Sequence, residues 1–196
     1  MPKVVDVVQR RAELTDAAAR LIARSGIESA TIREVAAEAG LSTRALTHYF
    51  ADKHELLLTT FNASLSQRRA RRPPDATVDP FDRLIASLEG ALPLDDDRRR
   101  HWLVTIALCS QAAGDPELAA AQRDAYAEFT GHVAALVVRC GLASDDSSDE
   151  FAAMLIAAAD GIAVQALFDD RRWPADRQRE VLGSMLASMG MRRRSG

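Results

Sequence analysis

The residues whose types and spacing could do chemistry are concentrated between residues 31 and 53. One short predicted helix there buries Leu46 and exposes Thr43, Arg44, Thr47 and His48. A guanidinium can make two hydrogen bonds to guanine, and hydroxyl groups can reach base edges or phosphate oxygens. Lys53 stands at the start of the next predicted helix, where its ammonium and the N-terminal amides both favour a phosphate. Together these residues predict a contact with double-stranded nucleic acid.

Two short predicted helices joined by a glycine turn position these side chains. The segment TIRE at residues 31–34 has the sequence of a capping box, which predicts a helix start. Gly40 can adopt the left-handed backbone that ends this helix, and Ser42 can cap the next one, which is expected to reach Phe50. Small Ala36 lets the two helices cross closely. This arrangement is a helix-turn-helix, which can place its second helix in the major groove; a helical hairpin that only packs is the alternative.

The rest of the chain is also predicted to be helical. Apolar residues spaced by three and four predict a first helix that ends at Gly26, and the segment DKHE at residues 52–55 is a second capping box that opens a longer helix. Five further helices are expected at residues 80–91, 97–113, 116–141, 148–168 and 175–190. No segment alternates with period two for long enough to predict a strand. The expected fold is all-α, with about nine helices.

The composition excludes several protein classes. With 47% hydrophobic and 27% charged residues over 196 positions, the chain is typical of a globular protein and not of a disordered one. Its two cysteines, Cys109 and Cys140, are too far apart for a disulfide scaffold or a zinc ribbon, and Cys109 is expected to be a small core residue. The N-terminus lacks the apolar core of a signal peptide, which predicts a cytoplasmic protein.

The longest apolar stretch runs from Phe151 to Phe168 and is interrupted by Asp160 and Gln165. It lies at the short limit for crossing a bilayer, so it is interpreted as a buried helix, and no membrane partner is expected.

Sequence motifs typical of catalysis or metal binding do not occur. The four histidines have no HExxH or comparable ligand spacing, and GxSxG, Walker and dinucleotide-binding motifs are missing. No catalytic residue, metal ion or cofactor is therefore expected. A helical-bundle enzyme and a ligand-free helical architectural protein are the more distant alternatives.

Charge is distributed unevenly along the chain. Residues 1–72 carry 12 Lys and Arg against 8 Asp and Glu, a net charge of +4, whereas residues 73–196 carry 13 against 20, a net charge of −7. A basic segment joined to an acidic body is typical of a nucleic-acid-binding domain followed by a second domain. Because the pair Pro73-Pro74 cannot continue a helix, domains are expected at residues 1–71 and 72–196.

The first domain resembles the DNA-binding region of the TetR family of bacterial transcription regulators, over about residues 8–68. The resemblance is carried by ATIREVA, AGLS, HYF and DKHELL between residues 30 and 57. It implies a three-helix DNA-binding domain joined by a linking helix, from residue 52, to a C-terminal helical bundle. The implied DNA contacts are Thr31, Arg33, Ser42, Thr43, Arg44, Thr47, His48, Tyr49 and Lys53. Arg44 and Thr47 stand where the family often has a small residue and a tyrosine, which makes Arg44 a candidate determinant of the operator.

The C-terminal half is similar to the BetI-like branch of this family. The similarity is carried by WLV at residues 102–104, DPEL at 115–118 and DGIAVQAL at 160–167. It implies a helical domain that binds an effector and dimerises, without identifying choline as the ligand. Because pockets are mostly apolar with a few polar groups, the expected lining is Trp102, Ile106, Gln111, Tyr126, Phe129, Asp160 and Gln165. Asp160 either receives a cationic ligand or a partner's arginine, or it hydrogen-bonds a neighbouring helix terminus or faces a solvent gap.

Two predicted helices are apolar on more than one side, which indicates an interface. The helix at 148–168 has one apolar stripe that includes Leu155 and a second apolar stripe that includes Met154. The expected homodimer contacts on this helix are Phe151, Met154, Ala157, Gly161, Val164 and Phe168. The helix at 116–141 has a second apolar side with Tyr126, Val133 and Val137. Both helices are expected to pair with their symmetry mates as a four-helix interface, with an internally packed monomer as the alternative.

These features predict a ligand-controlled, sequence-specific regulator of transcription. Two recognition helices, about 34–36 Å apart, meet successive major grooves of a palindromic operator in such a protein. A small-molecule effector that prefers another arrangement weakens DNA binding by linkage. The default expectation is a repressor released by its effector; an activator could use the same parts.

Overall fold

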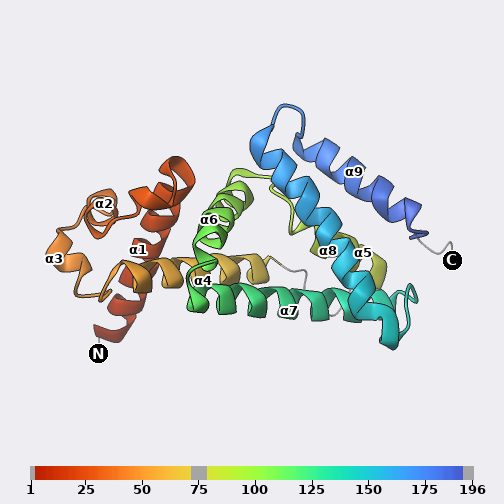
Figure 1. Cartoon of the computed structure of the whole chain (residues 1–196), viewed down its shortest axis with the longest axis horizontal. Coiled ribbons are helices and arrows are strands. Elements are labelled where there is room, and N and C mark those ends of the chain that lie inside the picture. The colour runs from red at the N-terminus through yellow and green to blue at the C-terminus, as the bar shows by residue number, and fades with distance from the viewer. Residues whose placement is uncertain (1–2, 72–78, 192–196) are drawn as a thin grey trace. The chain divides into compact units, whose positions relative to one another are not determined.

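The computed structural model describes residues 3–71 and 79–191, and every regular element within these residues is a helix (Figure 1). In chain order the elements are α1 (Lys3–Ser25), the 3-10 helix η1 (Ile27–Ser29), α2 (Ile32–Glu38), α3 (Thr43–Leu46), α4 (Lys53–Ala70), α5 (Pro80–Glu89), α6 (Asp96–Ala112), α7 (Pro116–Arg139), α8 (Asp145–Phe168) and α9 (Ala175–Ser188). The predicted all-α fold class is confirmed.

The predicted turn between α2 and α3 forms around a glycine. Gly40 has a φ of 70°, the left-handed conformation, and the amide of Leu41 donates to the carbonyl of Ala36 at 2.8 Å. These features close the C-terminal end of α2. The hydroxyl of Ser42 then accepts from the amide of Ala45 at 3.2 Å, so Ser42 caps α3 as predicted.

Only half of the first predicted capping box forms. The hydroxyl of Thr31 accepts from the amide of Glu34 at 3.2 Å. The carboxylate of Glu34 does not return to the amide of Thr31; it pairs with Arg33 at 2.9 Å, while that amide donates to the carbonyl of Ser29 at 2.9 Å. The amide of Thr31, to which the Glu34 carboxylate would bond in a complete capping box, is thus already hydrogen-bonded within the preceding turn.

The second predicted capping box forms at the start of α4 with its return bond displaced by one residue. The amide of Glu55 donates to the carboxylate of Asp52 at 2.8 Å, whereas the carboxylate of Glu55 accepts from the amide of Ala51, one residue before the cap, at 2.8 Å. Two amides at the helix start are nevertheless satisfied by these two side chains. The start of α4 is therefore set by residues within four positions of one another.

The helix α3 is shorter than predicted and ends at Leu46, not near Phe50. The chain continues as a turn in which the amide of Tyr49 donates to the carbonyl of Leu46 at 2.8 Å. This tighter bond brings Phe50 to the core, where it is only 1% exposed. Burial of the ring thus takes precedence over another turn of helix.

The chain divides into two compact units, and the division falls within α4, α6 and α7. One unit comprises residues 1–67 and 100–122, and the other comprises residues 68–99 and 123–196. The double proline at the expected domain boundary lies outside the described residues. The domains 1–71 and 72–196 stay a prediction.

The first unit has its core where α1, α2 and α3 meet. α1 packs against α2 and η1, and α2 packs against α3. Leu14, Val35 and Leu46 are fully buried there, and Phe61 of α4 is 1% exposed. Each such side chain contributes about 1.5–3 kcal/mol relative to an exposed position.

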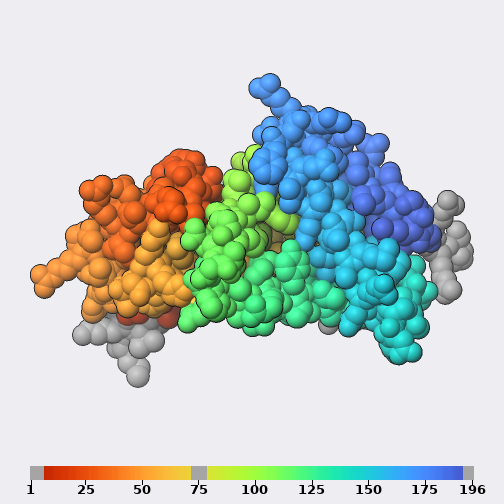
Figure 2. All heavy atoms as spheres, viewed as in Figure 1, coloured from red at the N-terminus to blue at the C-terminus, as the bar shows by residue number. Residues whose placement is uncertain are grey.

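In the second unit, α8 packs along α9 and against α5, and α8 and α9 lie side by side in Figure 1. Among the described helices, α8 is the one that has the length and hydropathy of a membrane span. One of its faces is nevertheless buried within the unit, including Leu155 and Ile162. Arg99 donates to the carbonyls of Ala166 and Leu167, both at 2.9 Å, and so satisfies the C-terminal end of α8. Other side chains of α8 reach the surface (Figure 2).

Candidate nucleic-acid interface and ligand site

A polar face lies on and directly after α3, and is here called the reading face. It consists of Thr43, Arg44, Thr47 and His48, all exposed, while Leu46 between them is fully buried. The buried leucine fixes the rotation of the segment, so the four polar side chains must point away from the core. The hydroxyl of Thr47 donates to the carbonyl of Arg44 at 3.0 Å, which leaves its oxygen lone pairs outward.

The other predicted DNA contacts have additional local roles. Thr31 and Ser42 use their hydroxyl oxygens as helix caps, and their hydroxyl hydrogens can still be donated. The side chain of Arg33 is 82% exposed although it pairs with Glu34. Tyr49 is half-buried, with its ring edge-on to that of His48 at 5.5 Å between centroids.

Lys53 occupies the first position of α4, as predicted. Its ammonium lies 3.7 Å from the carboxylate of Glu28, whose side chain is 85% exposed. A contact of this length between exposed groups is weak, so a phosphate can displace it.

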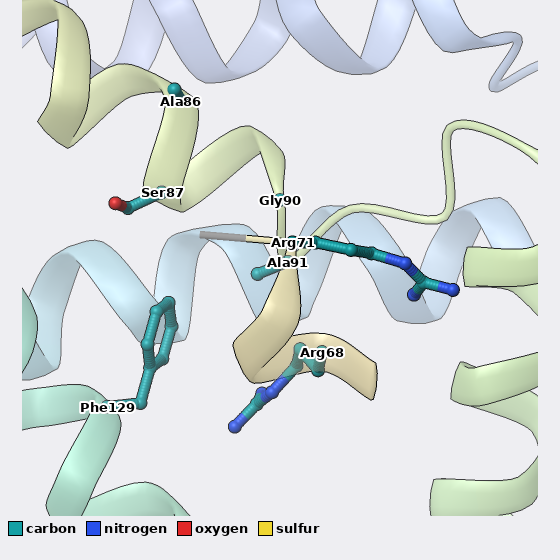
Figure 3. A pocket seen from close by; sticks show the side chains of 7 residues that line it. All are labelled: Arg68, Arg71, Ala86, Ser87, Gly90, Ala91 and Phe129. Atoms are coloured by element: carbon teal, nitrogen blue, oxygen red, sulfur yellow. The ribbon is translucent and has the colours of Figure 1, made fainter. Parts of the chain in front are cut away.

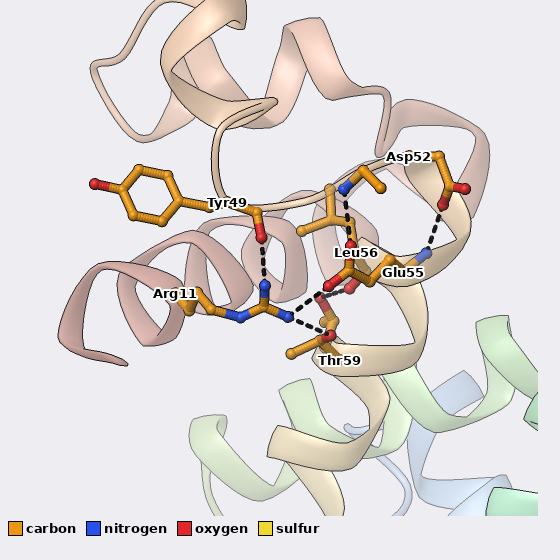
Figure 4. A network of polar contacts seen from close by, with 8 residues as sticks. Arg11, Tyr49, Asp52, Glu55, Leu56 and Thr59 are labelled. Carbon is orange, nitrogen blue, oxygen red and sulfur yellow. Dashed lines mark hydrogen bonds and ion pairs between the residues drawn. The ribbon is translucent and has the colours of Figure 1, made fainter. Parts of the chain in front are cut away.

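Arg11 of α1 holds the backbone after α3, a role that sequence reasoning missed. Its guanidinium donates to the carbonyl of Tyr49, to the carboxylate of Glu55 at 2.8 Å and to the hydroxyl of Thr59 at 3.4 Å (Figure 4). The same group lies 4.3 Å from the centre of the Phe50 ring. One side chain thus ties α1, the end of the reading segment and α4 together.

Two carboxylates in the first unit, those of Glu55 and Glu38, are held in their charged form. The pKa of Glu55 lies below its ordinary value because the Ala51 amide and then Arg11 bond to its charged form. The pKa of Glu38, on α2, is lowered by hydrogen bonds from Arg24 and Arg20 of α1. Glu55 thereby links α4 to α1, and Glu38 links α2 to α1, on either side of α3 in the sequence.

The predicted ligand-binding residues are divided between the two units. Trp102, Ile106 and Gln111 lie on α6 in the first unit, where Trp102 is buried and Gln111 is exposed. The second unit contains Tyr126, Phe129, Asp160 and Gln165. Of these, Phe129 is buried, Asp160 is half-buried, and Tyr126 and Gln165 are exposed.

Asp160 and Tyr126 are in direct contact. The phenol donates to the carboxylate at 2.7 Å. Burial raises the pKa of Asp160 above its ordinary value, while the Tyr126 hydrogen bond and the charge of Arg68 lower it. The carboxylate is therefore a partly desolvated anion with two compensating neighbours.

A narrow cavity in the second unit is lined by one predicted ligand residue, Phe129. The complete lining is Arg68, Arg71, Ala86, Ser87, Gly90, Ala91 and Phe129 (Figure 3). The guanidinium of Arg68 lies 5.0 Å from the centre of the Phe129 ring, whereas the side chain of Arg71 points to the opposite side (Figure 3). The lining contains two cations and no carboxylate.

One apolar side of α8 is uncovered in the single chain, and is here called the α8 outer face. It consists of Met154, Ala157, Gly161, Val164 and Phe168, all exposed, with Phe168 at 81% and Met154 at 50%. Phe151, which was predicted with this group, is half-buried. Most of the predicted interface residues therefore share one solvent-exposed surface.

Two expectations about apolar residues were wrong. Val133 and Val137 are fully buried within the chain, so the second side of α7 is covered internally and offers only Tyr126 outward. Cys109 is exposed and not a core residue, because it follows the buried position Leu108 on the outer side of α6.

Both halves of the chain match family models. Residues 14–60 match the model of bacterial regulatory proteins of the tetR family, and residues 80–190 match the model of the C-terminal domain of BetI-type transcriptional repressors. A curated relative, the HTH-type transcriptional regulator PksA of Bacillus subtilis (strain 168), is 30% identical over 187 residues, which cover 93% of this chain and 90% of the relative. The regulator BetI of Burkholderia cenocepacia (strain HI2424) is 37% identical over 126 residues, which cover 60% of this chain and 62% of that one.

Solved structures give the same result. A transcriptional regulator from Rhodococcus sp. Rha1 has a TM-score of 0.81 and 29% identity, with 91% of this chain and 96% of that chain covered. A transcriptional regulator from Saccharomonospora viridis in complex with choline has a TM-score of 0.83 and 25% identity, with 92% and 96% covered.

Proposed function

Because the chain belongs to the TetR family of transcriptional regulators, we propose that it is a repressor that leaves a palindromic operator when a small molecule binds. The family consists of regulators and not enzymes, so the expected absence of catalysis agrees with the membership. As a DNA-binding regulator, the protein is proposed to act in the cytoplasm, where bacterial operators are.

The reading face is the observation that carries this proposal. Thr43, Arg44, Thr47 and His48 are exposed together, and their orientation is fixed by buried Leu46. Arg44 is proposed to read guanine in the major groove, and Lys53 with the first amides of α4 to bind a phosphate. Specificity and general affinity are thereby assigned to different side chains.

A second copy of the chain is proposed to cover the α8 outer face. Five neighbouring apolar or small residues, including Val164 and Phe168, are exposed along one helix. The adjoining helix α9 exposes small residues, among them Gly183 and Ala187, which permit close approach. An isologous pair built on these helices gives the two-fold symmetry that a palindrome requires.

The effector is proposed to bind in the C-terminal helical domain. The relative from Saccharomonospora viridis was determined with choline, a quaternary ammonium. In this chain the guanidinium of Arg68 already lies over the ring of Phe129, so that ring face is taken by a cation of the protein itself. Choline is therefore not proposed as the effector. A screen of small molecules against the protein–operator complex would identify the effector.

The test is a footprint of the purified protein on the DNA that flanks its own gene, titrated across salt. Protection of a short palindrome supports the proposal, and protection without sequence preference contradicts it. If that DNA gives no protection, selection from random sequences decides whether any sequence is preferred. A reporter gene behind the protected site then distinguishes a repressor from an activator.

A further inference from the structure

A histidine at the start of α4 lies between two carboxylates at the start of α7, with a hydrogen bond to one and an ion-pair contact with the other. Nδ1 of His54 lies 2.9 Å from a carboxylate oxygen of Asp115, and Nε2 lies 3.1 Å from a carboxylate oxygen of Glu117. All three residues belong to the first unit. They are here called the His54 clasp.

The geometry favours a proton on each ring nitrogen. A neutral imidazole has one N–H and one lone pair, so its lone pair faces one of the two carboxylates and is repelled by it. The imidazolium has two N–H groups, so it can donate to Glu117 and also present positive charge to Asp115. The clasp is therefore complete only when His54 is charged.

We infer that His54 is a proton-dependent positioning residue for DNA binding, whose imidazolium holds the start of α4 against the start of α7. This inference rests on the proposed function, because it needs an operator to act on. His54 follows Lys53 directly on the first turn of α4, the turn whose amides are proposed to face a phosphate. Releasing one end of the clasp lets that turn move, which weakens the pre-arranged phosphate contact.

Asp115 has a separate role that makes the clasp testable. One of its oxygens, Oδ1, accepts from the amides of Glu117 and Leu118 at 3.0 and 3.1 Å and so caps α7. The other oxygen, Oδ2, lies 2.9 Å from Nδ1 of His54 and faces its charge. Because Asn caps a helix about as well as Asp, Asp115→Asn keeps the helix start while removing the charge that faces the histidine.

The carboxylates around the His54 ring all favour its protonated form. Asp115 and Glu117 from the start of α7 and Asp52 from the segment before α4 all favour the charged ring, and the hydrogen bond to Glu117 is the largest cause of a raised His54 pKa. Partial desolvation opposes them. The neighbouring charges Lys53 and Glu55 are paired with Glu28 and Arg11.

The test is operator affinity between pH 6 and 9 at constant ionic strength, with the site defined by the footprint. Affinity is expected to fall about fivefold or more as the clasp loses its proton in the wild type, a typical size for coupled sites. In His54→Gln this fall is expected to be lost. Asp115→Asn and Glu117→Gln are expected to move the fall to lower pH.

A matched control is Asp124→Asn, which removes an exposed carboxylate two turns further along the same helix. It is expected to keep the wild-type pH profile. An NMR titration of the histidine ring gives a readout that needs no DNA: its midpoint should lie above the ordinary value and drop in Glu117→Gln.

Equal pH profiles for the wild type and His54→Gln, or a midpoint at or below the ordinary value, would overturn the inference while leaving the regulator intact. If no sequence is preferred at any pH, the proposed function fails instead. The two failures are therefore distinguishable.

Discussion

The phenol of Tyr126 donates a hydrogen bond of 2.7 Å to the carboxylate of Asp160, and this bond connects the middle of α7 to the middle of α8. The bond compensates part of the cost of holding a charge in the apolar C-terminal part of α8. Burial nevertheless remains the largest influence on Asp160 and raises its pKa. The two residues therefore give predictions with opposite signs.

Asp160→Asn is expected to increase the free energy of unfolding at pH 7. An acid with a raised folded-state pKa contributes stability that is full below its unfolded pKa, near 4, and is lost as the pH rises through the folded value. The gain from the substitution should therefore shrink towards zero as the pH is lowered to about 3.5. Urea denaturation across this range measures it. Asp149→Asn, at an exposed position of the same helix, is the matched control.

Tyr126→Phe is expected to destabilise the protein at pH 7 by about 1 kcal/mol, because the half-buried carboxylate loses its donor. The loss should be smaller in the Asp160→Asn background, where no charge needs the hydroxyl. Thermal and urea denaturation of the four variants form a double-mutant cycle. Equal losses in both backgrounds would show that the hydroxyl acts on something other than Asp160.

Arg11→Ala is expected to lower the free energy of unfolding by about 1–2 kcal/mol, because the carbonyl of Tyr49 and the carboxylate of Glu55 both lose a charged donor. Operator affinity should fall as well, since the backbone after the reading face is released. The neighbour Arg10 pairs only with Glu13 among the contacts described, on the exposed side of α1. Arg10→Ala should therefore change stability by less than about 0.5 kcal/mol.

Arg44→Ala and Lys53→Ala are expected to affect DNA binding differently. Loss of Arg44 should cost about 1–3 kcal/mol on the operator and relax the preference at one base pair, with little effect on random DNA. Loss of Lys53 should weaken binding to every sequence and reduce the salt slope by about one. Fluorescence anisotropy on operator and random duplexes measures both. If Arg44→Ala weakens binding to both duplexes equally, Arg44 does not contribute to sequence recognition.

Gly161→Leu tests the α8 outer face as a dimer interface. A Cβ added at this position meets nothing within 4 Å inside the chain, so the folded protomer should accept a larger residue there. In a dimer built on this face it should raise the dissociation constant about tenfold or more, since interface centres depend on close packing. Gly131→Leu on α7 is the matched control, because its position is equally open. Sedimentation equilibrium that shows the same association for both variants would place the interface elsewhere.

The sequence predicted most helix boundaries because their signals are local. The side chains of Asp52 and Glu55 cap the start of α4 through amides within four positions of one another, and Gly40 adopts the left-handed turn that few other residues tolerate. The exposed sides of α3 and α8 were also predictable, since helical periodicity alone separates Leu46 from Arg44.

The remaining features depend on residues that are distant in the sequence. Arg11 reaches Tyr49 and Glu55 across 38 and 44 positions, and no periodic pattern marks such a contact. The burial of Val133 likewise depends on which helix covers it and not on its own helix. His54 was missed for the same reason, because its two carboxylates lie about sixty residues further along the chain.

The uncovered apolar side of α8 has a consequence for the dose response of the regulated gene. If two chains must associate through it before both halves of a palindrome can be bound, operator occupancy at low abundance rises with the square of the protein concentration. The melting temperature likewise becomes concentration-dependent by mass action. A small change in expression would then give a disproportionate change in transcription, so Phe168 and its neighbours set the steepness of the switch as well as its symmetry.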